Sequence, residues 1–130
     1  YIMIRTFLNS KIHKATVTDT QIDYEGSCQI DIELLNAVGI KPYEKIDIYN
    51  ITNGERFSTY AIEGPPSKGI ICVNGAACHK ASIGDKIIIC TYTDLEKNEI
   101  LNHSPKIIHV NEKNKIVPKN SGEKLKMHNG

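Results

Sequence analysis

The sequence has no tryptophan and only two phenylalanines among its 130 residues, so it offers few aromatic platforms on which nucleic-acid bases could stack. It also has no excess of positive charge, because 16 Lys and Arg side chains are nearly balanced by 15 Asp and Glu side chains. A binder of polyanions needs such an excess to neutralise phosphates. We therefore expect no nucleic-acid partner.

Long apolar runs are missing as well. Runs such as Ile87–Cys90 extend over a few residues, whereas a membrane-spanning helix needs about 20. The first residues, Tyr1 to Thr6, lack the basic-then-apolar order of a secretion signal. We therefore expect a cytoplasmic protein without a membrane partner, and the length suits a single domain with its own core.

The cysteines and histidines are not spaced as metal ligands. Cys28, Cys72, Cys78 and Cys90 form no C-x-x-C pair, and the five histidines show no ligand spacing to them or to one another. The sequence thus predicts no metal site and favours reduced cysteines that pack as small apolar side chains. Nothing adjacent to Cys28 would lower the pKa of its thiol, so a packing role in a strand is favoured over a nucleophilic one.

Short runs of Ile, Val, Thr and Tyr, separated by Gly, Pro, Asn and Asp, predict a mainly β protein. The expected strands are Ile4–Leu8, Ala15–Thr18, Ile22–Tyr24, Lys45–Ile51, Arg56–Ile62, Gly69–Val73, Lys86–Tyr92, Lys106–Val110 and Lys115–Val117. The expected helices are Ile32–Val38, with Asp31 as its cap and Gly39 at its end, Leu95–Asn102, capped by Asp94, and a turn at Ala76–Ala81. We assign residues 1–117 to one domain and residues 118–130, which are poor in apolar side chains, to a flexible tail.

One internal similarity predicts two related halves. Glu44-Lys45-Ile46-Asp47-Ile48 resembles Asp85-Lys86-Ile87-Ile88-Ile89, and each copy follows an expected short helix and a turn. A closed barrel is the natural architecture for two such halves, because closure leaves no exposed strand edge.

The stretch Tyr24–Cys28 is the first that carries reactive groups. Gly-Ser is an ordinary turn dipeptide, so this stretch alone favours a structural role. The functional alternative is that Gly26 adopts a strained backbone that directs the Ser27 hydroxyl at the Gly26 carbonyl.

The stretch Arg56–Ile62 has two unlike faces if it is a strand. Alternation places Arg56, Ser58 and Tyr60 on one side, and the residues between them on the more apolar side. An exposed pair is the simple interpretation of Arg56 and Tyr60, whose Cα atoms are expected about 13 Å apart. The functional alternative is that both flank a small anion, which the Arg fork would bind while the Tyr hydroxyl passes a proton.

Two further stretches have both a structural and a functional interpretation. Val73–Ala77 is a tight turn into a short helix, or a place where small residues let a ligand reach backbone N–H groups. Lys11–Lys14 is an exposed basic loop, or an extended segment in which Lys11 and His13 share a face.

Together these stretches resemble the pyruvoyl-dependent aspartate decarboxylase family. Five motifs occur in the order and at the spacing of that family: Met3-Ile4-Arg5-Thr6, Lys11-Ile12-His13-Lys14, Tyr24-Glu25-Gly26-Ser27-Cys28, Asn53-Gly54-Glu55-Arg56-Phe57-Ser58-Thr59-Tyr60 and Val73-Asn74-Gly75-Ala76-Ala77. The resemblance runs from Met3 to about Pro118, and Tyr1 and Ile2 precede the family's usual initiator methionine.

The resemblance implies a mainly β fold, a double-psi β-barrel with a few short helices, and a homotetramer with active sites at subunit contacts. It also implies a proenzyme that cleaves itself between Gly26 and Ser27. The Ser27 hydroxyl attacks the Gly26 carbonyl to form an ester, elimination leaves dehydroalanine, and hydrolysis gives a pyruvoyl group and ammonia.

The self-made pyruvoyl group is the covalent cofactor that the resemblance implies. It forms a Schiff base with L-aspartate and accepts the electron pair left by carbon dioxide, which yields β-alanine for pantothenate biosynthesis. The implied roles are pyruvoyl precursor for Ser27, proton donor for Tyr60, and cleavage for Gly26, Ser27 and Thr59. The implied substrate-binding residues are Lys11, Arg56, Thr59, Asn74, Gly75, Ala76 and Ala77, with His13 near the site and no metal.

Three features stand apart from this pattern. Strand alternation puts Thr59 on the face opposite Arg56 and Tyr60, which a bulge, strong curvature or a neighbouring subunit would reconcile. Tyr49 stands where some members carry Trp, and Cys78 follows the alanine pair.

A catalytically silent β-barrel that binds a peptide, protein or nucleic acid is the alternative from another functional class, because fold does not dictate function.

Overall fold

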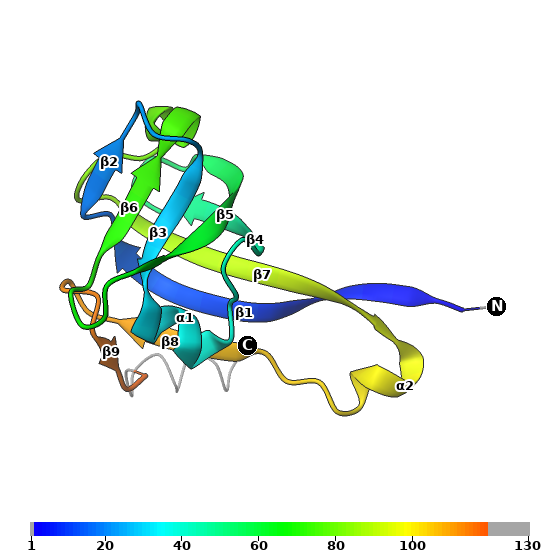
Figure 1. The fold of residues 1–130 in the computed structure, drawn as a ribbon. Helices are drawn as coiled ribbons and strands as arrows, with labels where there is room; N and C mark the ends of the chain where they lie inside the picture. Colours follow the sequence, from blue (N-terminus) through cyan, green and yellow to red (C-terminus); the bar gives the residue numbers. More distant parts are fainter. Residues whose placement is uncertain (1, 120–130) are drawn as a thin grey trace.

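The computed structural model describes residues 2–119, and it consists mainly of strands (Figure 1). The strands are β1 (Ile4–Thr16), β2 (Asp19–Gln21), β3 (Ser27–Asp31), β4 (Lys45–Asn50), β5 (Arg56–Gly64), β6 (Ile71–Asn74), β7 (Lys86–Glu96), β8 (Lys106–Val110) and β9 (Ile116–Val117). The helices are short: α1 (Ile32–Val38), the 3-10 helix η1 (Gly75–His79) and α2 (Lys97–Ile100). The predicted mainly β class with a few short helices is confirmed.

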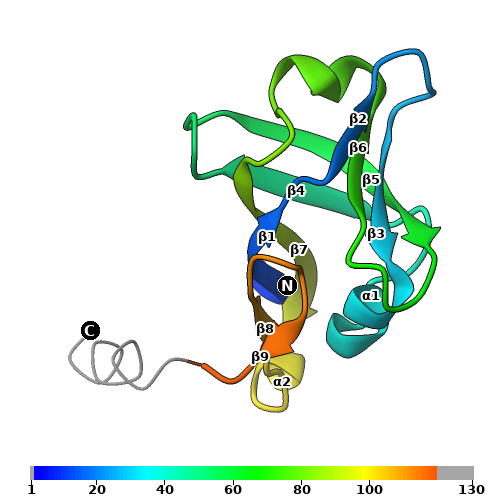
Figure 2. The same ribbon diagram turned by 90° about the vertical axis from the view of Figure 1, so that its left-hand side faces the viewer.

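The strand order closes the sheet into a barrel. Neighbours run in the order β2-β6-β3-β5-β4-β7-β1-β8-β9. Only Val17 and Thr18 separate β1 from β2. The continuous segment from β1 to β2 therefore pairs with β7 through β1 and with β6 through β2, which joins the two sides of the sheet. The backbone N–H of Thr18 donates to Ile71 O at 2.8 Å, which continues this junction. Figure 2 shows β1 and β7 on one side of the barrel and β3, β5 and β6 on the other.

The internal repeat of the sequence appears as a local two-fold arrangement. The repeat equates Ile48 with Ile89, and these two residues pair directly in the antiparallel contact of β4 and β7. The same offset equates Ile30 with Ile71, and these residues pair directly across β3 and β6. When two equivalent residues lie directly opposite each other in an antiparallel pair, a local two-fold axis passes between them. The two pairs therefore indicate that a two-fold axis relates the two halves of the barrel.

The turns and hydrogen bonds obey the same symmetry. Tyr43 and Gly84, which the repeat equates, both have a positive φ, at 70° and 95°. Tyr43 N–H donates to Ala61 O at 2.7 Å, and Gly84 N–H donates to Val17 O at 2.8 Å. Each half therefore adds a parallel strand, β5 beside β3 and β2 beside β6, to an antiparallel framework. Two interlocked halves of this kind make a double-psi β-barrel, as the sequence predicts.

The barrel interior is filled almost entirely by aliphatic side chains. Ile12, Ile46, Ile48, Ile87 and Ile89 have no exposed surface, and helix α1 contributes further apolar residues beside them. Helix α1 starts where Asp31 accepts the Glu33 N–H at 2.9 Å and ends at Gly39, whose φ is 74°. This core fixes the pleat of each strand, and therefore which residues point outward.

An arm extends from the barrel. The first part of β1 pairs with the last part of β7, from Ile4 opposite Glu96 to Leu8 opposite Tyr92, and α2 lies at its tip (Figure 1). Apolar side chains are exposed on it, including Ile4 and Leu101. The arm therefore presents apolar surface that the described chain does not cover.

Three strand predictions differ from the structure. Ile4–Leu8 and the first half of Ala15–Thr18 belong to one long strand that ends at Thr16, because a register shift between Ile12 and Ala15 lets Lys14 take a φ of 64° without ending the pairing. Ile22–Tyr24 is a turn rather than a strand, closed by Tyr24 N–H donating to Gln21 O at 3.2 Å.

The second predicted helix is shorter than expected. Asp94 pairs with Thr6 in the arm and accepts its hydroxyl at 2.7 Å, so it extends β7 and does not cap a helix. The cap is Glu96, which forms a capping box with Glu99. Of the predicted tail at 118–130, residues 120–130 lie outside the described residues.

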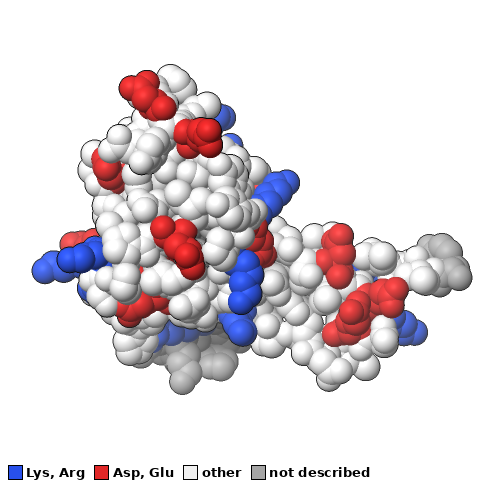
Figure 3. All heavy atoms as spheres, viewed as in Figure 1, with Lys and Arg blue, Asp and Glu red and all other residues white. Residues whose placement is uncertain are grey.

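The surface charge and the short helices agree with the balanced charge and the short apolar runs of the sequence. On the face in Figure 3, acidic and basic side chains are interspersed, and neither sign forms a continuous stripe. Within residues 2–119, no helix is long and apolar enough to cross a bilayer.

Candidate active site

Ser27 opens β3, and its neighbours on both sides are polar side chains. It pairs with Asn74 of β6 in antiparallel register. On the other side, Cys28 pairs with Ala61 of β5 in parallel register, so Ser27 and Tyr60 precede these partners at the same level. Cys28 and Ala61 are fully buried in the core. The alternation of a strand therefore puts Tyr60, Ser27 and Asn74 in one row on the outer face of the barrel.

The Ser27 hydroxyl is held by the amide of Asn74. Asn74 Nδ2 donates to Ser27 Oγ at 2.9 Å. Ser27 is 4% exposed and Asn74 is 1% exposed, although they lie on the outer face. A buried hydroxyl with a donor at this distance has its oxygen fixed in place, and negative charge on that oxygen would be stabilised.

Gly75 makes this close packing possible, whereas a Cβ added to Gly26 would meet nothing within 4 Å. Gly75 has a φ of 73°, and a Cβ built on it would lie 2.8 Å from the Gly26 Cα and 2.9 Å from the Gly26 nitrogen. The left-handed glycine of the site is therefore Gly75. Gly26 itself does not have a positive φ, so its backbone does not need glycine for a left-handed conformation. The constraint on residue 26 comes instead from contact with Gly75.

Thr59 alternates with the outward-facing Tyr60 on β5, and it is half-buried. The parallel register of β3 and β5 puts Thr59 at the level of Gly26, two residues before the pair Cys28 and Ala61. The pairing of β5 with β4 runs without a shift from Tyr60 to Arg56, so no bulge turns Thr59 outward. A bulge was one of three explanations for a site that uses both Thr59 and Tyr60, beside strong curvature and a neighbouring subunit. The unbroken register excludes the bulge.

Arg56 lies on the outer face, where it packs on a tyrosine. Its guanidinium carbon is 4.5 Å from the centre of the Tyr49 ring. The Tyr49 hydroxyl is 2.7 Å from that of Tyr92, and this hydrogen bond, followed by burial, raises the pKa of Tyr92 well above its usual range. The Tyr49 ring thus supports the Arg56 guanidinium.

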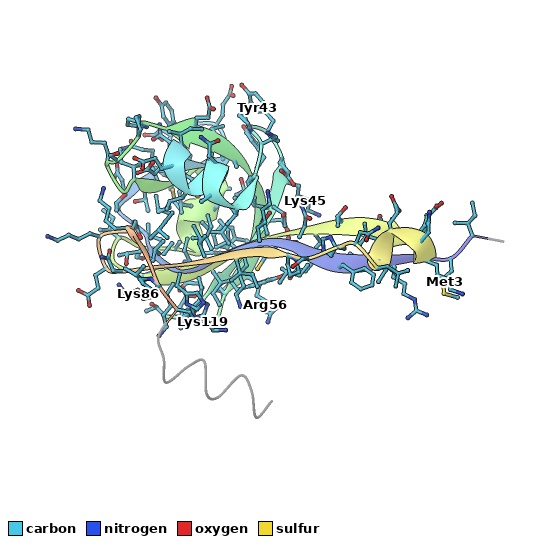
Figure 4. The ribbon with its side chains drawn as sticks, turned by 90° about the horizontal axis from the view of Figure 1, so that it is seen from below. Met3, Tyr43, Lys45, Arg56, Lys86 and Lys119 are labelled. Atoms are coloured by element: carbon cyan, nitrogen blue, oxygen red, sulfur yellow. The ribbon has the colours of Figure 1, made fainter. Side chains whose placement is uncertain are left out.

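Tyr60 stands at a distance from Arg56 on the same face. Its ring centre is 6.1 Å from that of Tyr43, and it pairs with Lys45 of β4. In the view of Figure 4, Tyr43 lies at the top of the molecule and Arg56 at the bottom, with Lys45 between them. The predicted shared face is confirmed, but Arg56 and Tyr60 do not converge within one chain.

Lys11 and His13 lie on β1, far from Ser27 along the sheet. Lys11 pairs with Cys90 of β7, and Cys90 pairs with Asp47 of β4. Strand β5 then lies between β4 and β3. Counted through β7, β4 and β5, four strand spacings separate Lys11 from β3, a path of about 19 Å around the barrel wall. The ring of His13 is 5.0 Å from that of His109 on β8. Lys11–Lys14 is part of a strand, so its interpretation as a loop is wrong.

Cys28 behaves as a packing residue. Burial, with a smaller contribution from Cys72, raises the pKa of Cys28 to about 12, so its thiol stays protonated. All four cysteines are free thiols. Among residues 2–119, His, Cys, Asp and Glu side chains form no group of three that could hold a metal ion.

Cys72, which the sequence did not single out, contacts the Asn74 amide. Cys72 Sγ donates to Asn74 Oδ1 at 3.2 Å, on the side of the amide away from Ser27. The sequence signal for this contact was available, because residues two apart on a strand share a face and Cys72 precedes Asn74 by two.

The predicted residues Ala76 and Ala77 follow Gly75 in η1, where Ala76 is exposed and Ala77 is half-buried.

Comparison with known proteins identifies relatives over most of the chain. The family model described as aspartate decarboxylase matches residues 3–117. An aspartate 1-decarboxylase of Thioalkalivibrio sulfidiphilus is 52% identical over 115 residues, which cover 88% of this chain and 91% of that protein. One of Ralstonia nicotianae is 51% identical over 114 residues, covering 88% and 95%. A rationally designed protein, mkDPBB_sym_86, is 12% identical with a TM-score of 0.46, covering 59% of this chain and 90% of that chain.

The contact between Gly75 and Gly26 can be tested by adding one methyl group. We expect Gly75→Ala to lower the free energy of unfolding by about 2 kcal/mol more than Gly54→Ala does. Gly54 is the matched control, because its φ of 79° is similar and its added Cβ would meet nothing within 4 Å. Urea unfolding of both variants, each also carrying Ser27→Ala so that the chain stays unbroken, measures the difference. Equal losses would contradict a steric role for Gly75.

Proposed function

The chain belongs to the aspartate decarboxylase family, and from this premise we propose that it converts L-aspartate to β-alanine and carbon dioxide for pantothenate biosynthesis. The observation that carries the proposal is the match over residues 3–117, in which the reactive Gly26-Ser27 pair is present and Ser27 is hydrogen-bonded by Asn74. As a decarboxylase the chain is a carboxy-lyase, and L-aspartate is its substrate.

The proposed cofactor is a pyruvoyl group made from Ser27. When present, it supplies a ketone that takes up the substrate amine and accepts the electron pair left by carbon dioxide. The residues at the site fit such a group. Residue 27 is buried against a donor at 2.9 Å, Asn74 Nδ2, which suits an oxygen-bearing group, and Gly75 leaves no side chain against the backbone of Gly26.

The chain's own residues then have three tasks. Lys11 and Arg56 hold the substrate carboxylates, for which the Arg fork is suited by its geometry. Tyr60 delivers a proton to the α carbon, a role supported by its position at the level of Ser27 on the same outer face. Asn74 and the backbone of Gly75 to Ala77 contact the substrate, and His13 lies near the site.

Thr59 acts earlier, in the self-cleavage between Gly26 and Ser27. Its support is the parallel register, which aligns it with Gly26. A hydroxyl there can donate to the Gly26 oxygen as charge develops on it.

We further infer that the complete site forms between copies of the chain in a homotetramer. Lys11 is four strands from Ser27, and Arg56 and Tyr60 are spread over the outer surface of the barrel, where a single copy cannot enclose a small substrate. The exposed apolar surface of the arm, including Leu101 at 86% exposure, suits burial against a second copy.

The first test is the mass of the polypeptide. We expect aged, purified parent protein to show residues 1–26 and 27–130 as separate masses under denaturing conditions, the second without a free amine at its start. Ser27→Ala is expected to remain one chain and to release no carbon dioxide from L-aspartate, because the attacking oxygen is gone. An intact parent chain would favour the alternative of a silent binding module, and an active Ser27→Ala protein would contradict the proposed chemistry.

The second test separates cleavage from turnover. Tyr60→Phe is expected to cleave normally but to lose about 100-fold in kcat, because only the proton transfer is removed. Tyr43→Phe is the matched control, since Tyr43 is 78% exposed and packs beside Tyr60 through its ring. Steady-state release of β-alanine measures both variants. Undiminished kcat in Tyr60→Phe would remove Tyr60 from this role.

The third test concerns the shared site. Lys11→Ala and Ser27→Ala chains are expected to be inactive when each is produced alone. When the two are produced together, mixed assemblies contain sites with an intact Lys11 from one copy and an intact Ser27 from the other. We therefore expect activity to return in the mixture. A mixture no more active than its parts would show that Lys11 and Ser27 of one site belong to the same copy.

A further inference from the structure

Three buried side chains form a line that ends at Ser27. Cys72 and Asn74 lie two residues apart on β6 and share its outer face, and Asn74 pairs with Ser27 on β3. Cys72 Sγ donates to Asn74 Oδ1 at 3.2 Å, and Asn74 Nδ2 donates to Ser27 Oγ at 2.9 Å. Cys72 and Ser27 are each 4% exposed and Asn74 is 1% exposed, so water does not compete for these groups.

The two ends of the Asn74 amide are chemically different, and Cys72 distinguishes them. A protonated thiol donates a weak hydrogen bond and accepts one poorly, so it favours the amide oxygen as its neighbour. The thiol is kept protonated because burial, followed by Asp19 and Cys78, raises the pKa of Cys72. With the oxygen turned to Cys72, the N–H₂ group has to face Ser27.

The opposite orientation would change what Ser27 can do. A reversed amide would present its oxygen to Ser27, and the serine hydroxyl would donate its proton to a group too weakly basic to remove it. In the observed orientation Ser27 Oγ accepts, so its proton is free to leave and the developing negative charge on oxygen is stabilised.

We propose that Cys72 is a positioning residue for the self-cleavage, which holds the Asn74 amide with its N–H₂ toward Ser27 Oγ. This inference rests on the proposed function. In the step that it assists, a bond forms between Ser27 Oγ and the Gly26 carbonyl carbon, and the amide bond between Gly26 and Ser27 breaks. The hydroxyl proton ends on the released nitrogen of residue 27, so the step needs no further reactant.

The experiment compares cleavage rates of freshly synthesised full-length chains, followed by denaturing mass spectrometry. Cys72→Ala is expected to cleave about fivefold more slowly, the rate equivalent of one hydrogen bond worth about 1 kcal/mol. Cys72→Ser is expected to restore a rate near that of the parent, because its hydroxyl donates to the same oxygen. Cys78→Ala is the matched control, since that thiol donates to Val73 O at 3.1 Å and not to Asn74, and it is expected to cleave at the parent rate.

A second arm tests whether Cys72 acts through Asn74. Adding Cys72→Ala to an Asn74→Ala chain is expected to change the rate less than twofold, whereas a general packing defect would persist in that background. The assignment is overturned if Cys72→Ala cleaves at the parent rate, if Cys72→Ser is as slow as Cys72→Ala, or if the effect survives in Asn74→Ala. A parent chain that does not cleave overturns the proposed function instead, so the two failures are distinguishable.

Discussion

The contact between the backbones of Gly26 and Gly75 is the constraint on which the site depends. A Cβ on Gly75 would fall 2.8 Å from the Gly26 Cα, so the chain can approach this closely only because residue 75 is glycine. That approach brings the start of β3 against the end of β6, where Ser27 pairs with Asn74. The burial of Ser27 and the donor at its oxygen both follow from this contact.

The barrel supplies the frame that makes the contact reproducible. The two-fold arrangement pairs Ile30 with Ile71 and Ile48 with Ile89, and these fully buried side chains lock the registers of β3 with β6 and of β4 with β7. A register that shifted by one residue would turn the aliphatic side chains out of the core, which costs far more than any local gain. The same core that stabilises the fold therefore also sets Ser27 opposite Asn74.

The sequence predicted the parts of this protein that depend on local pattern. The alternation of Arg56 to Ala61, the cap at Asp31 and the repeat at Ile48 and Ile89 all appear as expected, because each rests on periodicity or turn chemistry. It failed where distant partners decide. Asp94 extends a strand because Thr6 lies opposite it, and Gly75 packs against Gly26, which is distant in the chain, so neither contact is visible in neighbouring residues.

The pleat of β3 also explains why Ser27, and not the neighbouring Cys28, is the proposed nucleophile. A thiol is the better nucleophile, but Cys28 points into the core, where burial raises its pKa to about 12 and no partner can take its proton. Ser27, one residue earlier, points to the outer face, where Asn74 donates to its oxygen. Side chains alternate strictly along a strand, so the register that buries Cys28 also delivers Ser27 to the polar row. The choice of nucleophile is thus a consequence of core packing and not of intrinsic reactivity.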